Sequence, residues 1–406
     1  MPFLLTLLAM FLLVSPTQAE VLTGIDRLAQ RNFDLLQGKR VGLITNQTGR
    51  ARNGRSTIDL LATAPGVQLV ALFSPEHGIR GNEDVKLPSG RDSRTGLPIH
   101  SLYGATCRPT PAMLAGLDLL VFDIQDIGSR FYTYIGTLHH ALRAAKEQGI
   151  PLVVLDRPNP LGGVIVSGAT PEPEEVARRL ADDRTGCRSL TVTHPIPTRH
   201  GMTAAELARM INLENRIGAD LQMVPLIGWQ RRMLWNETGL SWVNPSPNMR
   251  DPLAALLYPG FGILEAGNLS VGRGTERPFH YYGAPWVDPQ AVLRRMPQLP
   301  GFRFSSASFT PTAPGHPYRN MQCHGIEVTL TDETVADPIL AGLHLTRAIY
   351  QAHPDRYRVS SGFHSMTGDR ATWQRMANGV LPEQIVADWR RTAAVFETRR
   401  LPYLLY

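Results

Sequence analysis

The strongest constraint on the fold is an alternation of short apolar runs with helix-length segments from residue 20 to about residue 226. The runs are rich in Val, Ile and Leu, are bounded by turn-forming residues, and cover residues 40–45, 67–73, 117–122 and 150–155. Continuous apolar strands that alternate with helices are typical of a parallel sheet covered on both faces. The pattern therefore predicts a doubly wound α/β domain.

Helices are expected between these runs, at residues 56–64, 134–147 and 203–215. Ser56 is a candidate cap for the first of them. Thr203, with Glu206 three residues later, has the spacing of a capping box at the start of the third.

The composition of the sequence and the order of its expected elements change after about residue 251. Loops rich in Gly, Pro and Tyr lead to an expected strand at residues 325–330 and to expected helices at residues 338–351 and 382–395. We therefore predict two domains after the first nineteen residues, an α/β domain over residues 20–250 and a smaller α+β domain over residues 251–406.

The first nineteen residues predict export. Residues 3–14 form an almost unbroken apolar run, which small residues follow up to Ala19, as in a signal peptide with its cleavage site. A run of about twelve apolar residues is too short for a bilayer, which needs about twenty. We therefore expect a periplasmic or extracellular protein without stable membrane insertion.

Three cysteines, at positions 107, 187 and 323, leave two possibilities open. An odd and widely spaced set predicts either one disulfide with a free thiol or three buried thiols, and not a disulfide framework. The sequence has no C-x-x-C and no H-E-x-x-H, so we expect no metal site.

Charge and motifs argue against two classes of ligand. The net charge of +6 is mild and no block of five like charges occurs, which argues against nucleic acid as a partner. The glycine-rich fingerprints of dinucleotide-binding and P-loop proteins are missing, as is the G-x-S-x-G elbow. We expect no cofactor.

Five polar clusters follow expected strands or a later apolar segment, at residues 45–49, 74–81, 123–134, 156–160 and 199–203. In an open α/β sheet, ligands bind outside the carboxyl ends of the strands. The clusters contain carboxylates, Arg, His, Asn and Tyr, which bind hydroxyls and anionic groups. They predict one polar pocket at this edge.

Glu76 is the first acid–base candidate, because it lies between a proline and a histidine on a loop flanked by glycine. A partly buried carboxyl there could act as a general acid. The alternative is a structural salt bridge with Arg80. Asn46, His77 and Arg80 belong to the same clusters and are predicted to bind substrate.

The third cluster and the last add five more candidates. One carboxyl of Asp123 and Asp126 could be a base or a ligand for a sugar hydroxyl, and the other a cap for the following helix. Arg130 and Tyr132 could bind a carboxylate or pack the helix start. His200 is an acid, an orienting group or a structural residue.

The second part of the chain contributes loops at residues 242–249, 258–260, 264–275 and 283–286. They combine Gly and Pro with Trp, Asn, Glu and Arg, as in a wall that binds sugar by aromatic faces and polar groups. We expect Asn248 and Arg273 to bind substrate. Alternatively, Trp242 and Trp286 belong to the core between the domains.

Several of these stretches together resemble one bacterial family. The matching stretches are residues 42–49, 73–81, 121–134, 155–160, 200–203, 245–249, 270–275 and 283–286. In these stretches the chain is similar to the DUF1343 family, the exo-β-N-acetylmuramidases of the NamZ type.

The resemblance implies a Rossmann-like domain, an ancillary carboxyl-terminal domain and a cleft between them. It implies release of terminal N-acetylmuramic acid from the non-reducing ends of peptidoglycan fragments, with Glu76 as general acid/base and Glu265 at the second acidic position. A non-catalytic exported protein that binds peptidoglycan is the alternative. An amidase or esterase is disfavoured by the missing nucleophile elbow and zinc motif.

Two routes are open for the second catalytic group. Asp123 or Glu265 acts directly as base or nucleophile, or the 2-acetamido oxygen of the substrate attacks while a carboxylate such as Asp123 orients it. Arg130, with Tyr132 and His200, would hold the lactyl carboxylate of muramic acid.

Overall fold

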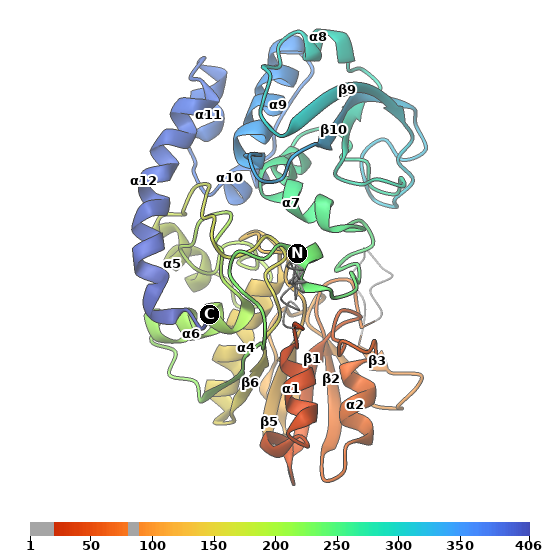
Figure 1. The fold of residues 1–406 in the computed structure, drawn as a ribbon, viewed down its shortest axis with the longest axis vertical. Helices are drawn as coiled ribbons and strands as arrows, with labels where there is room; N and C mark the ends of the chain where they lie inside the picture. Colours follow the sequence, from red (N-terminus) through yellow and green to blue (C-terminus); the bar gives the residue numbers. More distant parts are fainter. Residues whose placement is uncertain (1–19, 80–88) are drawn as a thin grey trace, which may run out of the picture.

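A computed structural model describes residues 20–79 and 89–406 of the chain. The first part is built on a seven-stranded sheet with the strand order β3-β4-β2-β1-β5-β6-β7 (Figure 1). All neighbouring strands are parallel except β3 and β4. The strands are β1 (Arg40–Thr45), β2 (Gln68–Ser74), β3 (Gly90–Arg91), β4 (Pro98–Ser101), β5 (Leu119–Asp123), β6 (Leu152–Leu155) and β7 (Leu221–Val224).

Helices cover both faces of this sheet, so the predicted doubly wound α/β domain is confirmed. Successive residues of β1 belong to the hydrophobic cores on opposite faces of the sheet. Leu43 packs with α1 and α2, and Ile44 packs with α4 and α6. The helical segments of this part are α1 (Gly24–Gln30), η1 (Asp34–Leu36), α2 (Thr57–Thr63), α3 (Pro111–Leu114), α4 (Tyr134–Gln148), α5 (Pro173–Ala181), α6 (Ala204–Glu214) and η2 (Trp235–Thr238).

Both predicted helix caps are confirmed. The Ser56 hydroxyl accepts a hydrogen bond of 3.0 Å from the Asp59 backbone N–H at the start of α2. Thr203 and Glu206 form the capping box of α6. The pattern did not predict β4 and β7, because each has only four residues and most of them are only partly buried.

The smaller α+β domain is also confirmed. Its sheet has the order β8-β10-β9 and is antiparallel. Its elements are α7 (Pro252–Phe261), η3 (Gly262–Ala266), β8 (Tyr281–Ala284), α8 (Pro289–Leu293), β9 (Phe302–Phe309), β10 (Cys323–Leu330), α9 (Pro338–Ala352), α10 (Gly362–Thr367), α11 (Thr372–Ala377), α12 (Pro382–Arg400) and η4 (Leu401–Tyr403). Residues 258–260 were expected in a loop and instead lie in α7, which has Pro259 within it.

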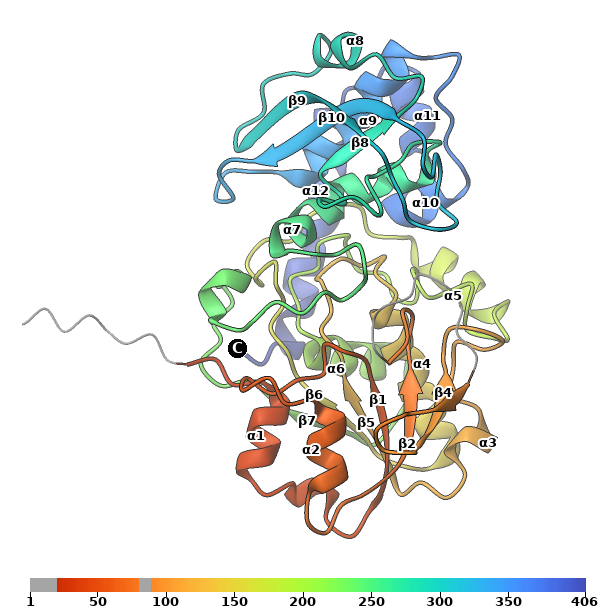
Figure 2. The ribbon, with the colours of Figure 1, turned by 90° about the vertical axis from the view of Figure 1, so that its right-hand side faces the viewer.

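The last helix joins the two parts of the molecule. From the second domain, α12 runs back along the first (Figures 1 and 2). Arg400 donates a 2.8 Å hydrogen bond from Nη1 to the Gly201 carbonyl, and the Tyr406 hydroxyl donates one of 2.7 Å to Asp156 Oδ2. These buried and half-buried contacts fix the second domain on the carboxyl edge of the large sheet.

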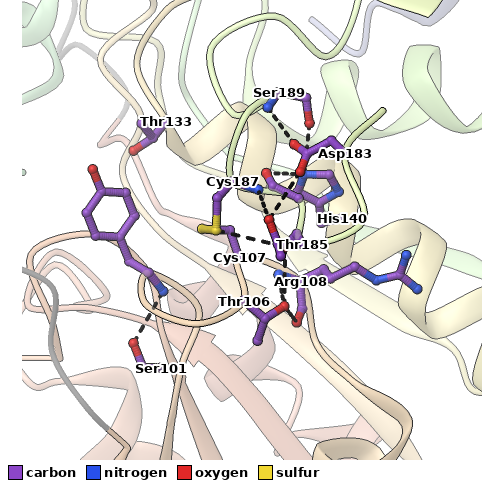
Figure 3. The surroundings of a disulfide bond; sticks show 12 residues. Ser101, Thr106, Cys107, Arg108, Thr133, His140, Asp183, Thr185, Cys187 and Ser189 are labelled. Atoms are coloured by element: carbon purple, nitrogen blue, oxygen red, sulfur yellow. Dashed lines mark hydrogen bonds between the residues drawn. A yellow bond between two sulfur atoms is a disulfide. The ribbon is translucent and has the colours of Figure 1, made fainter. Parts of the chain in front are cut away.

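The cysteines adopt the first of the two possible arrangements. Cys107 and Cys187 form a disulfide across 80 residues of sequence, and Cys323 is a buried free thiol (Figure 3). Around the disulfide, His140 Nε2 lies 2.9 Å from the Gly186 carbonyl oxygen. Within residues 20–79 and 89–406, no helix has the length and apolar character to cross a bilayer.

Candidate active site

The polar clusters meet at the carboxyl edge of the sheet, where direct hydrogen bonds join them. The Gln125 backbone N–H donates to Thr48 Oγ1 at 2.9 Å, which joins the loops after β1 and β5. The Asn159 side-chain amide donates to the Met202 carbonyl at 3.0 Å, which joins the loop after β6 to the start of α6. Most of these polar groups are buried, so the edge is mainly an internal network.

Asn46 shapes this network from the loop after β1. Its Oδ1 accepts hydrogen bonds from the Thr48 backbone N–H at 2.9 Å and hydroxyl at 2.5 Å, and its Nδ2 donates to the Tyr134 hydroxyl at 2.9 Å. Tyr134 donates in turn to the Pro245 carbonyl at 2.5 Å. Because Asn46 is buried, we now expect it to position the site and not to bind substrate directly.

Glu76 lies on the loop after β2 and is partly exposed. Thr133, at the start of α4, donates its hydroxyl to Glu76 Oε2 at 2.6 Å. The next residue, His77, is buried and has a φ of 71°, in the left-handed region that a non-glycine residue rarely adopts. The turn therefore presents the Glu76 carboxylate in one orientation. Arg80 lies outside the described residues.

Tyr132 lies near Glu76 and packs against the second domain. Burial raises the pKa of Tyr132 well above its ordinary value, and the nearby carboxylates of Glu76 and Asp126 act in the same direction. Its ring packs edge-on against that of Tyr258, with centroids 5.9 Å apart. Tyr258 donates its hydroxyl to Glu265 Oε2 at 3.2 Å. Tyr258 therefore links Tyr132 of the first domain with Glu265 of η3.

Glu265, in η3, is held by an arginine. Arg273 donates to Glu265 Oε1 from Nε at 2.8 Å and from Nη2 at 2.5 Å, and its guanidinium carbon lies 5.2 Å from the centre of the Phe279 ring. Charge-assisted hydrogen bonds of this kind fix a carboxylate firmly. Asn248 Oδ1 accepts a 2.9 Å hydrogen bond from the Gly274 backbone N–H, so Asn248 positions the loop that carries Arg273.

Asp126 and His200 face each other in a nearly dry environment. Asp126 Oδ2 lies 4.0 Å from His200 Nε2 and accepts a 2.7 Å hydrogen bond from the Gly128 backbone N–H. Among the described residues, neither Asp126 Oδ1 nor His200 Nε2 has a hydrogen-bond partner. Burial raises the pKa of Asp126 to about 7 and lowers that of His200 to about 3. The imidazole is therefore neutral at neutral pH.

The structure assigns Asp123 a structural position. It is fully buried, and its Oδ1 and Oδ2 accept hydrogen bonds from Arg157 Nε at 2.5 Å and Nη2 at 2.9 Å. The Thr57 hydroxyl also donates to Oδ2. A carboxylate enclosed in this way cannot reach a sugar, so the expectation of a direct role for Asp123 is corrected.

Arg130 likewise differs from expectation. Its guanidinium donates to the carbonyls of Thr191 at 3.0 Å, Ser365 at 3.0 Å and Met366 at 2.6 Å. It is 2 % exposed, and burial lowers its pKa to about 9. Since its donors bind backbone oxygens of both domains, it joins the domains and is not placed to hold a lactyl carboxylate. His200 is 0 % exposed and accepts from the Met202 N–H at 3.1 Å, so it is structural too.

Three residues that contact the candidates were not singled out from the sequence: Thr133, Tyr258 and Arg157. Thr133 lies inside the third cluster, but nothing in the local sequence relates it to Glu76, 57 residues away. Within the described residues, no group of three or more potential metal ligands occurs.

Comparison with known proteins covers nearly the whole chain. The family model of the exo-β-N-acetylmuramidase NamZ matches with its N-terminal part at residues 41–253 and with its C-terminal part at residues 256–406. The peptidoglycan β-N-acetylmuramidase NamZ of Bacillus subtilis (strain 168) is 40% identical over 393 residues, which are 95% of this chain and 92% of that protein.

Two solved structures of DUF1343 family proteins from Bacteroides fragilis are similar as well. One has a TM-score of 0.84 at 36% identity and covers 95% of this chain and 99% of its own. The other has a TM-score of 0.76 at 30% identity and covers 96% and 99%. The fold and these matches together show that the chain belongs to the NamZ family of exo-β-N-acetylmuramidases.

Proposed function

We propose that this chain is an exo-acting glycoside hydrolase that releases terminal N-acetylmuramic acid from the non-reducing ends of peptidoglycan fragments. Membership of the NamZ family and the 40% identity to the Bacillus subtilis enzyme support this activity. The observation that carries the proposal is the placement of Glu76, a partly exposed carboxylate that is oriented by the Thr133 hydroxyl and lies near enough to Tyr132 to influence its ionisation.

Glu76 is the proton donor in this mechanism. Glycoside hydrolysis needs an acid that protonates the leaving oxygen and a second group that meets the oxocarbenium-like centre. The Thr133 hydroxyl occupies one oxygen of Glu76, which leaves the other oxygen of the carboxyl to carry the transferred proton.

Glu265 is our choice for the second group. Its double hydrogen bond with Arg273 holds the carboxylate in one geometry, as a base or nucleophile requires. The alternative is attack by the substrate's own 2-acetamido oxygen. In that route Asp126 replaces Asp123 as the orienting carboxyl, because its side chain is 14% exposed while that of Asp123 is fully buried.

Selection of muramic acid over glucosamine requires a cation for the lactyl carboxylate. With Arg130 bound to backbone carbonyls, we assign this role to Arg273, which also lies close enough to Tyr132 to influence its ionisation. His77 and Arg80 stay predicted substrate contacts.

We also propose that the protein acts outside the cytoplasm. This part of the proposal rests on residues 1–19, which lie outside the described residues and have the composition of a signal peptide. Saccharides from peptidoglycan that end in N-acetylmuramic acid would be found there.

The test is hydrolysis by the purified protein. The disaccharide of N-acetylmuramic acid β-linked to N-acetylglucosamine should be cleaved to its two sugars, identified by mass spectrometry, while the disaccharide of two N-acetylglucosamines should stay intact. Binding of the first disaccharide without any cleavage would instead support the non-catalytic alternative.

A further inference from the structure

A pocket lies on the flank of the first domain, away from Glu76. It has a volume of about 750 Å³ and is formed by α4, α5 and the end of α6, with Arg399 of α12 on one side. These four helices lie together in Figure 1. Thr133 contacts Glu76 at the start of α4, and Arg143 lies ten residues further along, about 15 Å away at 1.5 Å per residue.

The charge of this flank pocket is unbalanced. Four cationic side chains and two carboxylates line it, and both carboxylates already form ion pairs. Glu147 is bound by Arg108 at 2.5 Å, and Glu214 is bound by Arg399 at 3.0 Å. Three cations of the pocket have no ion-pair partner in the described part of the chain, namely Arg143, Lys146 and Arg216. The pocket is therefore suited to an anion.

Two buried imidazoles form part of its wall. His139 is 1 % exposed, and neither of its ring nitrogens has a hydrogen-bond partner among the described residues. His194 binds Glu214 through Nε2 at 2.7 Å, while its Nδ1 has no partner there. Burial lowers the pKa of His139 well below its ordinary value, so the ring is neutral, with one donor and one acceptor nitrogen. Unsatisfied buried groups of this kind are uncommon in native proteins.

The remaining wall is apolar. It is lined by Val176, Ala177 and Leu180 of α5 and by Ile217. An inorganic ion would leave this surface without a partner. The volume falls within the range of about 300–1,000 Å³ that is usual for sites of small organic ligands.

We propose that the flank pocket binds a short acidic peptide with small apolar side chains. The carboxylates of the peptide face Arg143, Lys146 and Arg216, its apolar side chains lie on α5, and its amide groups reach the two imidazoles. Peptidoglycan carries peptides with carboxylates, so such a site would hold a second part of the same material. The inference does not depend on the glycosidase activity, because it concerns binding alone.

The test is titration calorimetry of the full chain with the dipeptide Ala-Glu, and with Ala-Gln and inorganic phosphate as comparison ligands. We expect saturable binding of Ala-Glu, with weaker binding of Ala-Gln. The double variant Arg143→Glu/Lys146→Glu should weaken binding by at least about tenfold, because each substitution replaces a cation that attracts the peptide carboxylates with an anion that repels them. Ala177→Trp should block the pocket by volume.

Arg294→Glu is the matched control, since it reverses an exposed arginine of the second domain, which does not line the pocket. It should leave binding unchanged. Circular dichroism and thermal unfolding verify that each variant is folded, and Ala177→Trp tests the site without any change of charge. The proposal is overturned if Ala-Glu does not bind, if both pocket variants bind it as tightly as the wild type, or if phosphate binds as tightly as Ala-Glu.

Discussion

The Thr133 hydroxyl lies 2.6 Å from Glu76 Oε2 and thereby joins the first turn of α4 to the loop after β2. Glu76 is partly exposed, and its neighbour His77 holds a left-handed backbone conformation. The orientation of the carboxyl therefore comes from one side-chain hydrogen bond and one strained turn. Both can be tested.

Glu76→Gln should abolish proton donation and leave the shape of the site unchanged. Loss of a general acid costs about 10²–10⁴-fold in rate. We expect this loss on the natural disaccharide and a much smaller one on an aryl glycoside of N-acetylmuramic acid, whose leaving group needs little protonation. Steady-state kinetics on both substrates measure the difference. Equal losses on both would point to a nucleophilic or structural role.

Thr133→Val should reduce kcat on the natural disaccharide by about tenfold or more, because a hydrogen bond to a charged group contributes about 1.5–3 kcal/mol. Thr133→Ser keeps the hydroxyl and should keep most of the activity. Steady-state kinetics on the natural disaccharide measure kcat and KM of both variants. Equal kcat values in all three proteins would show that the contact does not orient Glu76 for catalysis.

Glu265→Gln should reduce the rate on the natural disaccharide and on the aryl glycoside to a similar extent. The reason is that the second group acts at the sugar carbon, where the leaving group has little influence. Glu276→Gln changes an exposed carboxylate in the segment that follows η3, and as the matched control it should behave as the wild type. A Glu265→Gln variant with full activity would favour the route through the 2-acetamido oxygen.

Arg130→Met should destabilise the protein and leave substrate affinity unchanged in the fraction that folds. The substitution removes the donors of three carbonyls, and we expect the free energy of unfolding to fall by about 2–4 kcal/mol. Urea unfolding measures this change, and KM is determined at a temperature where the variant is folded. A tenfold rise in KM without loss of stability would restore Arg130 as a substrate ligand.

Asp126→Asn should change the pH dependence of stability. Burial raises the pKa of Asp126 to about 7 from an ordinary value of 3.8, so between these values the folded protein keeps a proton that the unfolded chain releases. The stability contributed by this group is fully present below about pH 4 and is lost as the pH rises towards 7. Asparagine does not titrate, so the variant should gain stability relative to the wild type over this range.

The free energy of unfolding of Asp126→Asn should increase relative to the wild type by up to about 1.4 kcal/mol per pH unit. His200 makes the stability of the wild type rise with pH, the opposite of the Asp126 contribution, because burial lowers its pKa to about 3. The difference between variant and wild type cancels this contribution and isolates Asp126. Urea unfolding at pH 5 and pH 7.5 measures it; a difference that is constant with pH would show that the Asp126 pKa is ordinary.

Local patterns in the sequence determined much of the framework. The apolar run at residues 40–45 became β1, Ser56 became the cap of α2, and Thr203 with Glu206 became the capping box of α6. Each of these features depends on residues a few positions apart, so a single sequence contains all the information needed. The same holds for the order of strands and helices that predicted the parallel sheet.

Only the tertiary structure decided what the individual polar residues do. Asp123 and Glu76 are both carboxylates that follow apolar strands, but Asp123 is enclosed by Arg157, 34 residues away, and Glu76 is left partly exposed. Arg130 binds carbonyls 235 and 236 residues away. Whether a charged side chain is free for substrate depends on which distant groups satisfy it, because burial without a partner is too costly, and that pairing is set by the packing of the two domains.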